Sequence, residues 1–348
     1  MRARGLRAGL RGWGGVGAMA LACALAVLFA LLLPMVRSHS EGGGADAGGQ
    51  GTVHGRQARA AGECTEPEKQ TLSPSSADGP TIKAIQDRKG AKRKLVVGVD
   101  QNSYRWGYRD PNSGGDAELE GFDIDLARRI AQDILGSPKD VQFKAIPTDQ
   151  REKAIADQRV DMVVRTMTIS CERMEKVDFS APYFRTGQQL LAPRSSPITG
   201  YNSTLAGKRI CTAASSTALS TLEQDRLDGG WGARADLRTV VPNQLDCLVR
   251  LQLGEVDAVV TDGALAASQA AQDPTVALKG DTFTTEYYGV AMRKGADDLV
   301  RRVNQILVEW RADTTGGWQH SYDEWLSKTM GADWRGSAPP KPEYLRES

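Results

Sequence analysis

Short apolar runs alternate with amphipathic segments along most of this chain. In GFDIDLARRIAQDILG, residues 121–136, Phe122, Leu126, Ile130 and Ile134 fall on one face at the helical period, and a glycine follows as a stop signal. Further helices are predicted at 81–90, 149–160, 215–225, 244–256 and 263–271 and twice within 297–326, and strands at 94–100, 141–146, 161–169, 187–193, 207–213, 237–242, 257–262 and 287–295. This alternation predicts parallel sheets covered by helices.

Two segments of the chain share one plan. IADQRVDMVVRTMT, residues 155–168, and LQLGEVDAVVTDGA, residues 251–264, both run from a helix end through V-D-x-V-V into a polar pair. Arg165-Thr166 in the first aligns with Thr261-Asp262 in the second. Because ligands of open α/β sheets bind outside the carboxyl ends of the strands, we predict two α/β units with their polar strand ends facing a cleft. Coincidence between two generic units is the alternative.

The N-terminal segment reads as a membrane helix. The apolar run Val16–Val36 has about 21 residues, enough to span a bilayer, and the arginines before it place its start in the cytoplasm. We favour an uncleaved anchor over a cleaved signal peptide or a lipoprotein signal ending at Cys23, because apolar residues continue well past that cysteine. Each alternative places the rest of the chain outside the membrane, beginning with a flexible tether rich in Gly, Ala and Ser at 39–80.

Composition narrows the possible functions. The 348 residues are enough for two modest domains, and a formal net charge of +1 gives no reason to expect a nucleic acid partner. The 3 histidines lack clustered Cys/His spacing, so we expect no metal and no cofactor.

The four cysteines that follow the apolar run, Cys64, Cys171, Cys211 and Cys247, form an even set in an oxidising compartment. Cys211 lies on a predicted strand and Cys247 on a predicted helix of the same unit, so we expect these two to pair. Cys64 and Cys171 then pair by elimination. Four buried thiols are the alternative.

The polar strand ends carry groups that suit an amino acid. Arginine meets a carboxylate with two parallel hydrogen bonds, and Arg173 follows a strand end within one turn region. Asp262 ends the equivalent strand, where a carboxylate suits an ammonium group, and the ASST segment 214–217 resembles an anion site at a helix start. The plainer alternatives are a surface ion pair for Arg173 and helix capping for Asp262, Ser216 and Thr217.

Four segments together resemble a known family. They are GFDIDLARRIA, TMTISCERMEKVDFSAPYF, VDAVVTD and TTEYYGVAMRKG, and they are similar to the bacterial extracellular solute-binding proteins of family 3, which serve polar amino acid ABC transporters. The likeness covers Lys94 to Leu326, and RICTAASSTALSTLEQD, LDCLV and FTTEYYG most resemble the glutamate-binding branch.

The resemblance implies an α/β, two-lobe periplasmic-binding-protein-like (type II) fold with two hinge crossover strands, at 179–190 and 284–292. An N-terminal transmembrane or signal helix precedes it. The implied division is a basic segment and membrane helix at 1–38, a tether at 39–80, lobe 1 at 81–186 and 285–330, lobe 2 at 187–284, and a tail at 331–348.

Matched position by position, the resemblance also implies ligand contacts. Arg173 takes the α-carboxylate with the hydroxyl of Thr168 beside it, and Asp262 takes the ammonium group. The remaining expected contacts are the Thr166 carbonyl to the ammonium, Ser216 and Thr217 to the carboxylate, and Tyr104 or Trp106 as a cover. The usual glycine before the hydroxyl pair is Ser215 here, so that backbone is expected to differ.

A side-chain carboxylate on the ligand would need one more cation. Arg105, Arg109 and Arg165 are available, and Arg165 is the first choice because it adjoins Thr166 at the strand end. We therefore expect glutamate or aspartate as the ligand, with glutamine or asparagine next.

The expected function is binding without catalysis. A monomeric protein at the outer face of the cytoplasmic membrane would close on the amino acid and deliver it to separate ABC permease subunits. One alternative is an anchored sensor that feeds a membrane signalling partner. The other is a dehydratase-like enzyme on the same fold, which the sequence disfavours because His39, His54 and His320 lie outside the predicted cleft and the plainer role of Glu286 is in the hinge.

Overall fold

The computed structural model describes residues 64–347, apart from 111, 113, 115–116 and 331–337. The predicted membrane helix, Cys23 and most of the predicted tether lie outside the described residues. Within the part that is described, no helix combines the length and the apolar character needed to cross a membrane.

A five-stranded sheet forms the centre of the first of two lobes, called lobe 1. Its strand order is β5-β1-β6-β15-β7; β5, β1 and β6 are parallel, and β15 is antiparallel to both of its neighbours. The strands are β1 (Leu95–Val99), β5 (Val141–Ala145), β6 (Met162–Val163), β7 (Val177–Phe179) and β15 (Ala291–Arg293). Because β15 comes from late in the chain, lobe 1 is built from two chain segments.

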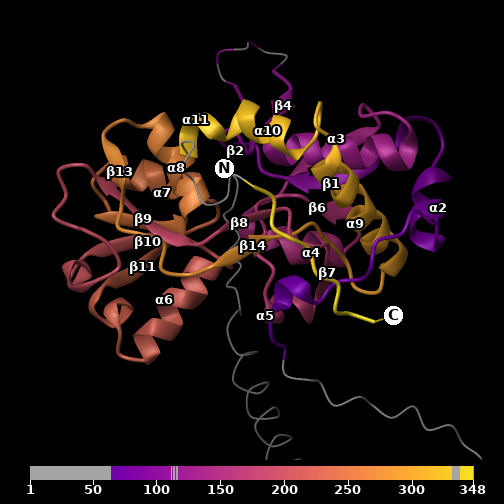
Figure 1. The fold of residues 1–348 in the computed structure, drawn as a ribbon. Coiled ribbons are helices and arrows are strands. Elements are labelled where there is room, and N and C mark those ends of the chain that lie inside the picture. Colours follow the sequence, from indigo (N-terminus) through magenta and orange to yellow (C-terminus); the bar gives the residue numbers. More distant parts are fainter. Residues whose placement is uncertain (1–63, 111, 113, 115–116, 331–337, 348) are drawn as a thin grey trace, which may run out of the picture. The chain divides into compact units, whose positions relative to one another are not determined.

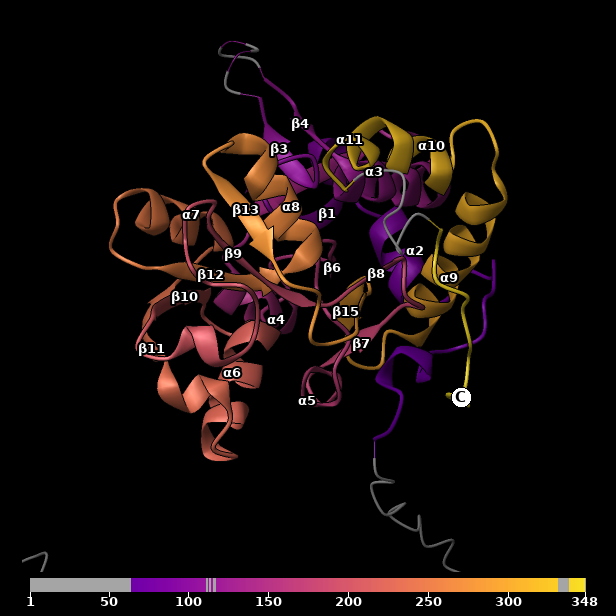
Figure 2. The same cartoon turned by 60° about the vertical axis from the view of Figure 1, so that its left-hand side comes forward.

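Helices and a small sheet complete lobe 1 (Figures 1 and 2). The helices are α2 (Pro80–Gln86), α3 (Phe122–Leu135), α4 (Arg151–Ala156), α5 (Cys171–Met174), α9 (Asp297–Ala312) and α10 (Trp318–Trp325). The next helix, α11 (Ser327–Met330), extends from α10 to contact α8 (Gly263–Gln272) of the second lobe. The small sheet holds β2 (Asn102–Ser103), β3 (Gly107–Arg109) and β4 (Leu119–Glu120). The apolar face predicted for α3 is buried, and Phe122 packs edge-on against Trp106 and Trp318.

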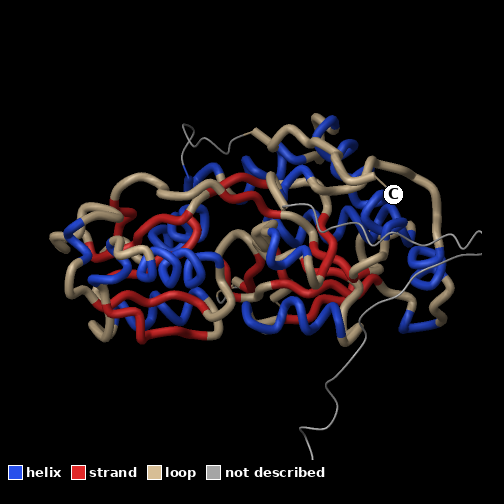
Figure 3. Tube along the Cα trace, turned by 90° about the horizontal axis from the view of Figure 1, so that it is seen from below, coloured by secondary structure: helices blue, strands red, loops and turns tan. Residues whose placement is uncertain are grey.

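Lobe 2 has a second five-stranded sheet, formed by one continuous stretch of chain. Its order is β11-β10-β12-β9-β13, with β9 antiparallel to β12 and β13. The strands are β9 (Gln188–Pro193), β10 (Arg209–Ala213), β11 (Asp236–Val241), β12 (Ala258–Asp262) and β13 (Val276–Lys279), and the helices are α6 (Thr217–Leu227), α7 (Gln244–Gln252) and α8 (Gly263–Gln272). In Figure 3 the strands gather in two groups, each flanked by helices.

Two short antiparallel strands link the lobes, as the expected crossovers required. They are β8 (Phe184–Thr186) and β14 (Glu286–Tyr288), and they lie between the two large sheets in Figure 1. Next to them, a Cβ added to Gly187 would overlap the carbonyl oxygen of Thr284. Glycine is therefore required where the two crossovers approach each other.

The predicted strand 161–169 is mostly not a strand. Only β6 pairs in the sheet, and the chain beyond it turns where Thr166 takes a φ of 40°. The predicted helix 149–160 is likewise shorter, because the turn η3 (Thr148–Gln150) precedes α4 and the helix ends at Ala156. The turn before α4 brings the buried Thr148 to the edge of lobe 1 that faces lobe 2, where its backbone N–H donates to the carbonyl of Pro242.

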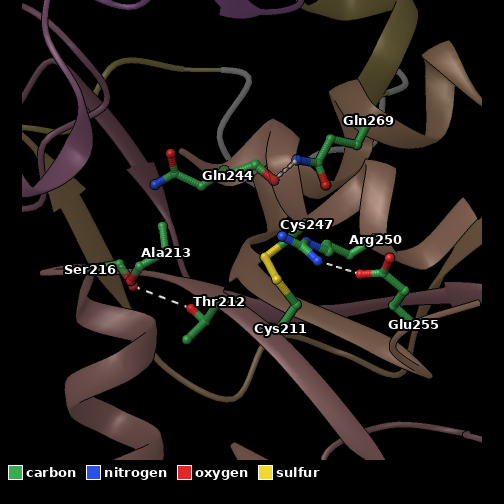
Figure 4. Close-up of a disulfide and its surroundings, with 9 residues drawn as sticks. All are labelled: Cys211, Thr212, Ala213, Ser216, Gln244, Cys247, Arg250, Glu255 and Gln269. Atoms are coloured by element: carbon green, nitrogen blue, oxygen red, sulfur yellow. Dashed lines mark hydrogen bonds and ion pairs between the residues drawn. A yellow bond between two sulfur atoms is a disulfide. The ribbon is translucent and has the colours of Figure 1, made fainter. Parts of the chain in front are cut away.

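Both predicted disulfides are present. Cys211 on β10 pairs with Cys247 on α7, and Cys64 pairs with Cys171 at the start of α5. Figure 4 shows the first of them joining strand to helix, and both of its cysteines are fully buried in the apolar core of lobe 2.

We expect the double substitution Cys211→Ala and Cys247→Ala to lower the free energy of unfolding by about 4 kcal/mol, because the bond closes a loop whose chain entropy it removes from the unfolded state. Urea unfolding without reductant measures the change. A loss below about 1 kcal/mol would contradict this contribution.

Candidate functional site

A cavity of about 610 Å³ lies between the two lobes beside the hinge, within the size range of small-molecule sites. Lobe 1 contributes the turn before α4 and the segment around α5, lobe 2 the start of α6, and the crossover before β14 the third wall. Its wall includes Thr148, Glu152, Thr168, Arg173, Ser215, Thr217 and Glu286.

Arg173 places a buried guanidinium at this cavity. The short helix α5 carries it, and the side chain of Ser170 caps that helix by accepting from the backbone N–H of Arg173. Nη1 donates to the carbonyl of Thr168 at 2.7 Å and Nη2 to the carbonyl of Ser215, across the cleft, at 3.0 Å. Burial lowers the pKa of Arg173, and the nearby Glu286 carboxylate opposes that shift. The side chain therefore bridges the lobes, and its Nε lies 3.9 Å from the Glu152 carboxylate on the same cavity wall.

Glu286 joins both lobes to the hinge. Its Oε2 accepts from Thr168 Oγ1 in lobe 1 at 2.6 Å and from Thr217 Oγ1 in lobe 2 at 2.8 Å. Its Oε1 accepts from Gln188 Nε2 at 2.8 Å. Thr168 and Thr217, both predicted as ligand contacts, thus lie on the cavity wall and donate to a carboxylate.

Asp262 lies next to this carboxylate but is not on the described cavity wall. It ends β12 and precedes α8 without capping that helix through its side chain. The hydroxyl of Tyr288 donates to it at 2.6 Å, and the amide of Gln188 donates to both Asp262 and Glu286. Burial, followed by the charge of Glu286, raises the pKa of Asp262 to about 7. Two acidic groups therefore converge where the sequence predicted one.

The structure assigns Arg165 a different role from the one predicted. Its side chain is fully buried, and its Nη2 lies 2.8 Å from the Asp100 carboxylate and 3.1 Å from Asn243 Oδ1. Its Nη1 donates to Thr148 Oγ1 at 3.0 Å. The charge of Arg165 is thus already matched within lobe 1, and this side chain is not on the described cavity wall.

Four other predicted contacts are not on this wall either: Trp106, Tyr104, Ser216 and Thr166. Trp106 lies in the core of lobe 1 among Phe122, Phe184 and Tyr288, so it cannot cover a ligand in this cavity. Tyr104 packs against Tyr108 and borders a separate gap between the lobes.

Ser216 caps α6, its plainer alternative, by accepting from the N–H of Leu219 and donating to the carbonyl of Ala213. Figure 4 shows it beside Thr212 at the start of that helix. Ser215, in place of the usual glycine, takes a φ of 54° and turns its carbonyl toward lobe 1. Ser215 is therefore a left-handed residue whose carbonyl oxygen meets Arg173.

Thr166 is fixed by a hydrogen bond to a buried acid, Asp123, and is not on the cavity wall. Its backbone N–H donates to Asp123 Oδ2 at 3.0 Å, and the Tyr183 hydroxyl donates to Asp123 Oδ1 at 2.8 Å. Burial raises the pKa of Asp123 to about 7 despite these two hydrogen bonds.

Arg151 is a buried cation beside the cavity that the sequence did not identify. It is not on the described wall itself, but it contacts Thr148 and Ser215, which are. Only 3% exposed, it donates from Nε to the carbonyl of Thr148 at 2.9 Å and from Nη2 to the carbonyl of Ser215 at 3.3 Å. Burial lowers its pKa, and the charges of Arg173 and Arg165 lower it further. Among the described residues, no carboxylate lies within 4 Å of its guanidinium. In TDQREKA it reads as a surface helix residue, and only its burial reveals it.

Comparison with known proteins identifies the family. Residues 95–328 match the family model of the bacterial extracellular solute-binding proteins, family 3, and the chain belongs to that family. It is 33% identical to the ABC transporter glutamine-binding protein GlnH of Bacillus subtilis over 71% of this chain and 85% of that one.

Two further similarities agree with this assignment. The chain is 27% identical to the glutamate-binding protein GluB of Corynebacterium efficiens over 73% of this chain and 87% of that one. A solute receptor for L-cysteine of Neisseria gonorrhoeae has a similar structure, with a TM-score of 0.67 and 25% identity over 75% of this chain and 100% of that one. The two-lobe fold expected from the sequence is confirmed.

The raised pKa values of Asp123 and Asp262 predict a pH effect on stability. Between pH 4 and pH 7 the folded chain retains protons that the unfolded chain has released, so these groups stabilise the fold at low pH and lose that contribution as the pH rises. Relative to Asp123→Asn or Asp262→Asn, the wild-type free energy of unfolding should fall by about 1–4 kcal/mol between pH 4.5 and pH 7.5. Urea unfolding across this range tests it; parallel curves for the wild type and both variants would contradict it.

Proposed function

We propose that this protein binds an amino acid outside the cytoplasmic membrane and delivers it to the permease of an ABC uptake system. The observation that carries the proposal is one cavity whose wall holds a guanidinium, Arg173, on lobe 1 and a carboxylate, Glu286, on the hinge. A second carboxylate, Asp262 of lobe 2, lies next to Glu286 beyond this wall and shares the Gln188 amide with it. A zwitterion supplies the opposite charge to each. Family membership and the curated relatives, named for binding glutamine and glutamate, support this reading.

The backbone of the ligand follows from these charges. Its α-carboxylate meets Arg173, whose two hydrogen bonds to carbonyl oxygens hold the guanidinium in place. Its ammonium lies against Glu286 and Asp262. Because both acids are buried next to each other, a cation between them relieves their repulsion and returns the pKa of Asp262 toward its ordinary range.

The ligand side chain is acidic in this proposal, and it extends past Thr148 and Ser215 on the cavity wall to Arg151, which lies just beyond them. A buried guanidinium without an anion is costly, and Arg151 shares the Ser215 carbonyl with the like-charged Arg173. A second carboxylate on the ligand would neutralise Arg151. Glutamate fits this pattern, and glutamine, which has the same length, is the competing ligand.

Closure couples binding to delivery. In the described state the lobes meet through Arg173 to Ser215, Arg165 to Asn243, and Glu286 to Thr217. A ligand that contacts both lobes adds bonds available only when they meet, so it shifts the population toward the closed form. A permease that recognises the closed arrangement would then accept loaded protein.

We expect a thermal-shift panel over the twenty amino acids to show the largest rise with glutamate, because a ligand that binds the folded state raises its stability. Arg173→Met should weaken binding of that ligand by about 30-fold to several-thousand-fold in calorimetry, the effect of removing one partner of a buried charge pair. Arg238→Met, a surface arginine in lobe 2 with a side chain 89% exposed, is the matched control. The proposal fails if no amino acid binds the wild type.

Substitutions of Arg151 and Arg165 should differ in their effects on glutamate and glutamine binding. Arg151→Gln is expected to weaken glutamate by about 30-fold or more and glutamine by less than about threefold, since only glutamate has a second carboxylate. Arg165→Gln should lower stability by leaving Asp100 unpaired and should weaken both ligands alike. Equal losses for glutamate and glutamine in Arg151→Gln would rule out an acidic side chain at this position.

A further inference from the structure

The segment 64–72, called the N-terminal brace, lies across the part of lobe 1 that carries Arg173. Its first end is covalent, because Cys64 is bonded to Cys171, the first residue of α5. Its second end is a buried hydrogen bond from Thr71 Oγ1 to the carbonyl of Phe179 at 2.8 Å. The brace therefore connects the first residue of α5 to the last residue of β7.

The brace is itself fixed to the rest of lobe 1. Leu72 is fully buried in the core, and Asn304 on α9 donates to Thr71 Oγ1 at 3.0 Å and to the carbonyl of Leu72. The backbone N–H groups of Leu345 and Arg346 donate to the carbonyls of Lys69 and Thr71. These contacts make the brace a rigid reference for α5.

The helix that needs this support is α5. It has 4 residues, so its own hydrogen bonds cannot hold it as a stable unit. Within it, Arg173 lies two residues after the bonded Cys171, and Pro67 of the brace lines the same cavity as Arg173. The helix that orients the guanidinium of Arg173 therefore begins with a residue that is covalently bonded to the brace.

We infer that the Cys64–Cys171 disulfide is a positioning element for the α-carboxylate contact: it holds α5 so that Arg173 meets the ligand without reorganisation. This inference rests on the proposed function, in which Arg173 binds that carboxylate. Preorganisation of this kind raises affinity because the cost of ordering the group is met before the ligand arrives.

The disulfide can be tested separately from the one in lobe 2. Cys64 is exposed and Cys171 half-buried, whereas Cys211 and Cys247 are fully buried. A small dithiol should therefore reduce the first bond selectively, and alkylation followed by mass spectrometry would identify the two cysteines that become labelled. The variant Cys64→Ser with Cys171→Ser removes the bond without a reductant, and both forms should behave alike.

The decisive measurement compares glutamate with its α-amide, which lacks the α-carboxylate charge. Without the bond, the affinity for glutamate should fall by about 5- to 30-fold, and the affinity for the α-amide by less than about threefold. The ratio of the two affinities, called the gap, should therefore decrease. Val300→Ala, a core change in α9, is the stability control and should leave that gap unchanged. An unchanged gap in the disulfide variant, or equal losses for both ligands, would overturn the inference.

A second measurement needs no ligand, so failure of the proposed function would not obscure the result. Hydrogen exchange at the amides of residues 172–176 should quicken in the disulfide variant, while exchange in α9 stays as in the wild type. Unchanged exchange at 172–176 would overturn the brace even if glutamate binds. If no amino acid binds but this exchange quickens, the brace stands and the proposed function fails.

Discussion

The site depends on the burial of like charges beside each other. Arg151, Arg165 and Arg173 are each less than a tenth exposed, and the charges of Arg173 and Arg165 add to burial in lowering the pKa of Arg151. Arg165 has a carboxylate of its own lobe, Asp100, at 2.8 Å, and Arg173 has Glu152 at 3.9 Å. Arg151, which has no carboxylate within 4 Å among the described residues, draws on backbone carbonyl oxygens, which lower the cost of burial without supplying a negative charge. An anionic ligand would complete that arrangement.

The acidic side of the cleft also buries like charges next to each other, here two carboxylates. Glu286 and Asp262 share the amide of Gln188, and the hydroxyls of Thr168, Thr217 and Tyr288 supply their remaining hydrogen bonds. Because Glu286 belongs to a hinge strand, its contacts with both lobes connect the charge state of the cleft to the angle of closure. Ligand binding and lobe closure therefore both involve the carboxylate of Glu286.

Sequence patterns were sufficient for most of the fold. The helical period of α3 and the apolar runs of β1 and β12 each report a local preference that the tertiary structure keeps. Position within the family motif also placed Arg173 and Thr168 on the cavity wall. Arg151 and Arg165 could not be told apart in this way, because which of them meets Asp100 depends on how distant turns pack. The prediction that Trp106 covers the ligand was wrong for a related reason. An aromatic loop residue can either cover a ligand or pack in a core, and only the burial of its side chain in the folded protein distinguishes the two.

The path of the chain through lobe 1 has a consequence for biosynthesis. Strand β15 lies between β6 and β7, so the first large sheet has a gap at an interior position until residues near 293 are available. Lobe 2 has all its strands by residue 279 and can assemble earlier. Arg346 then pairs with the buried Asp178 at the end of the chain. A product released early from the ribosome would carry a finished second lobe but no complete first one, and would present the cell with an open sheet for its quality-control proteases to recognise.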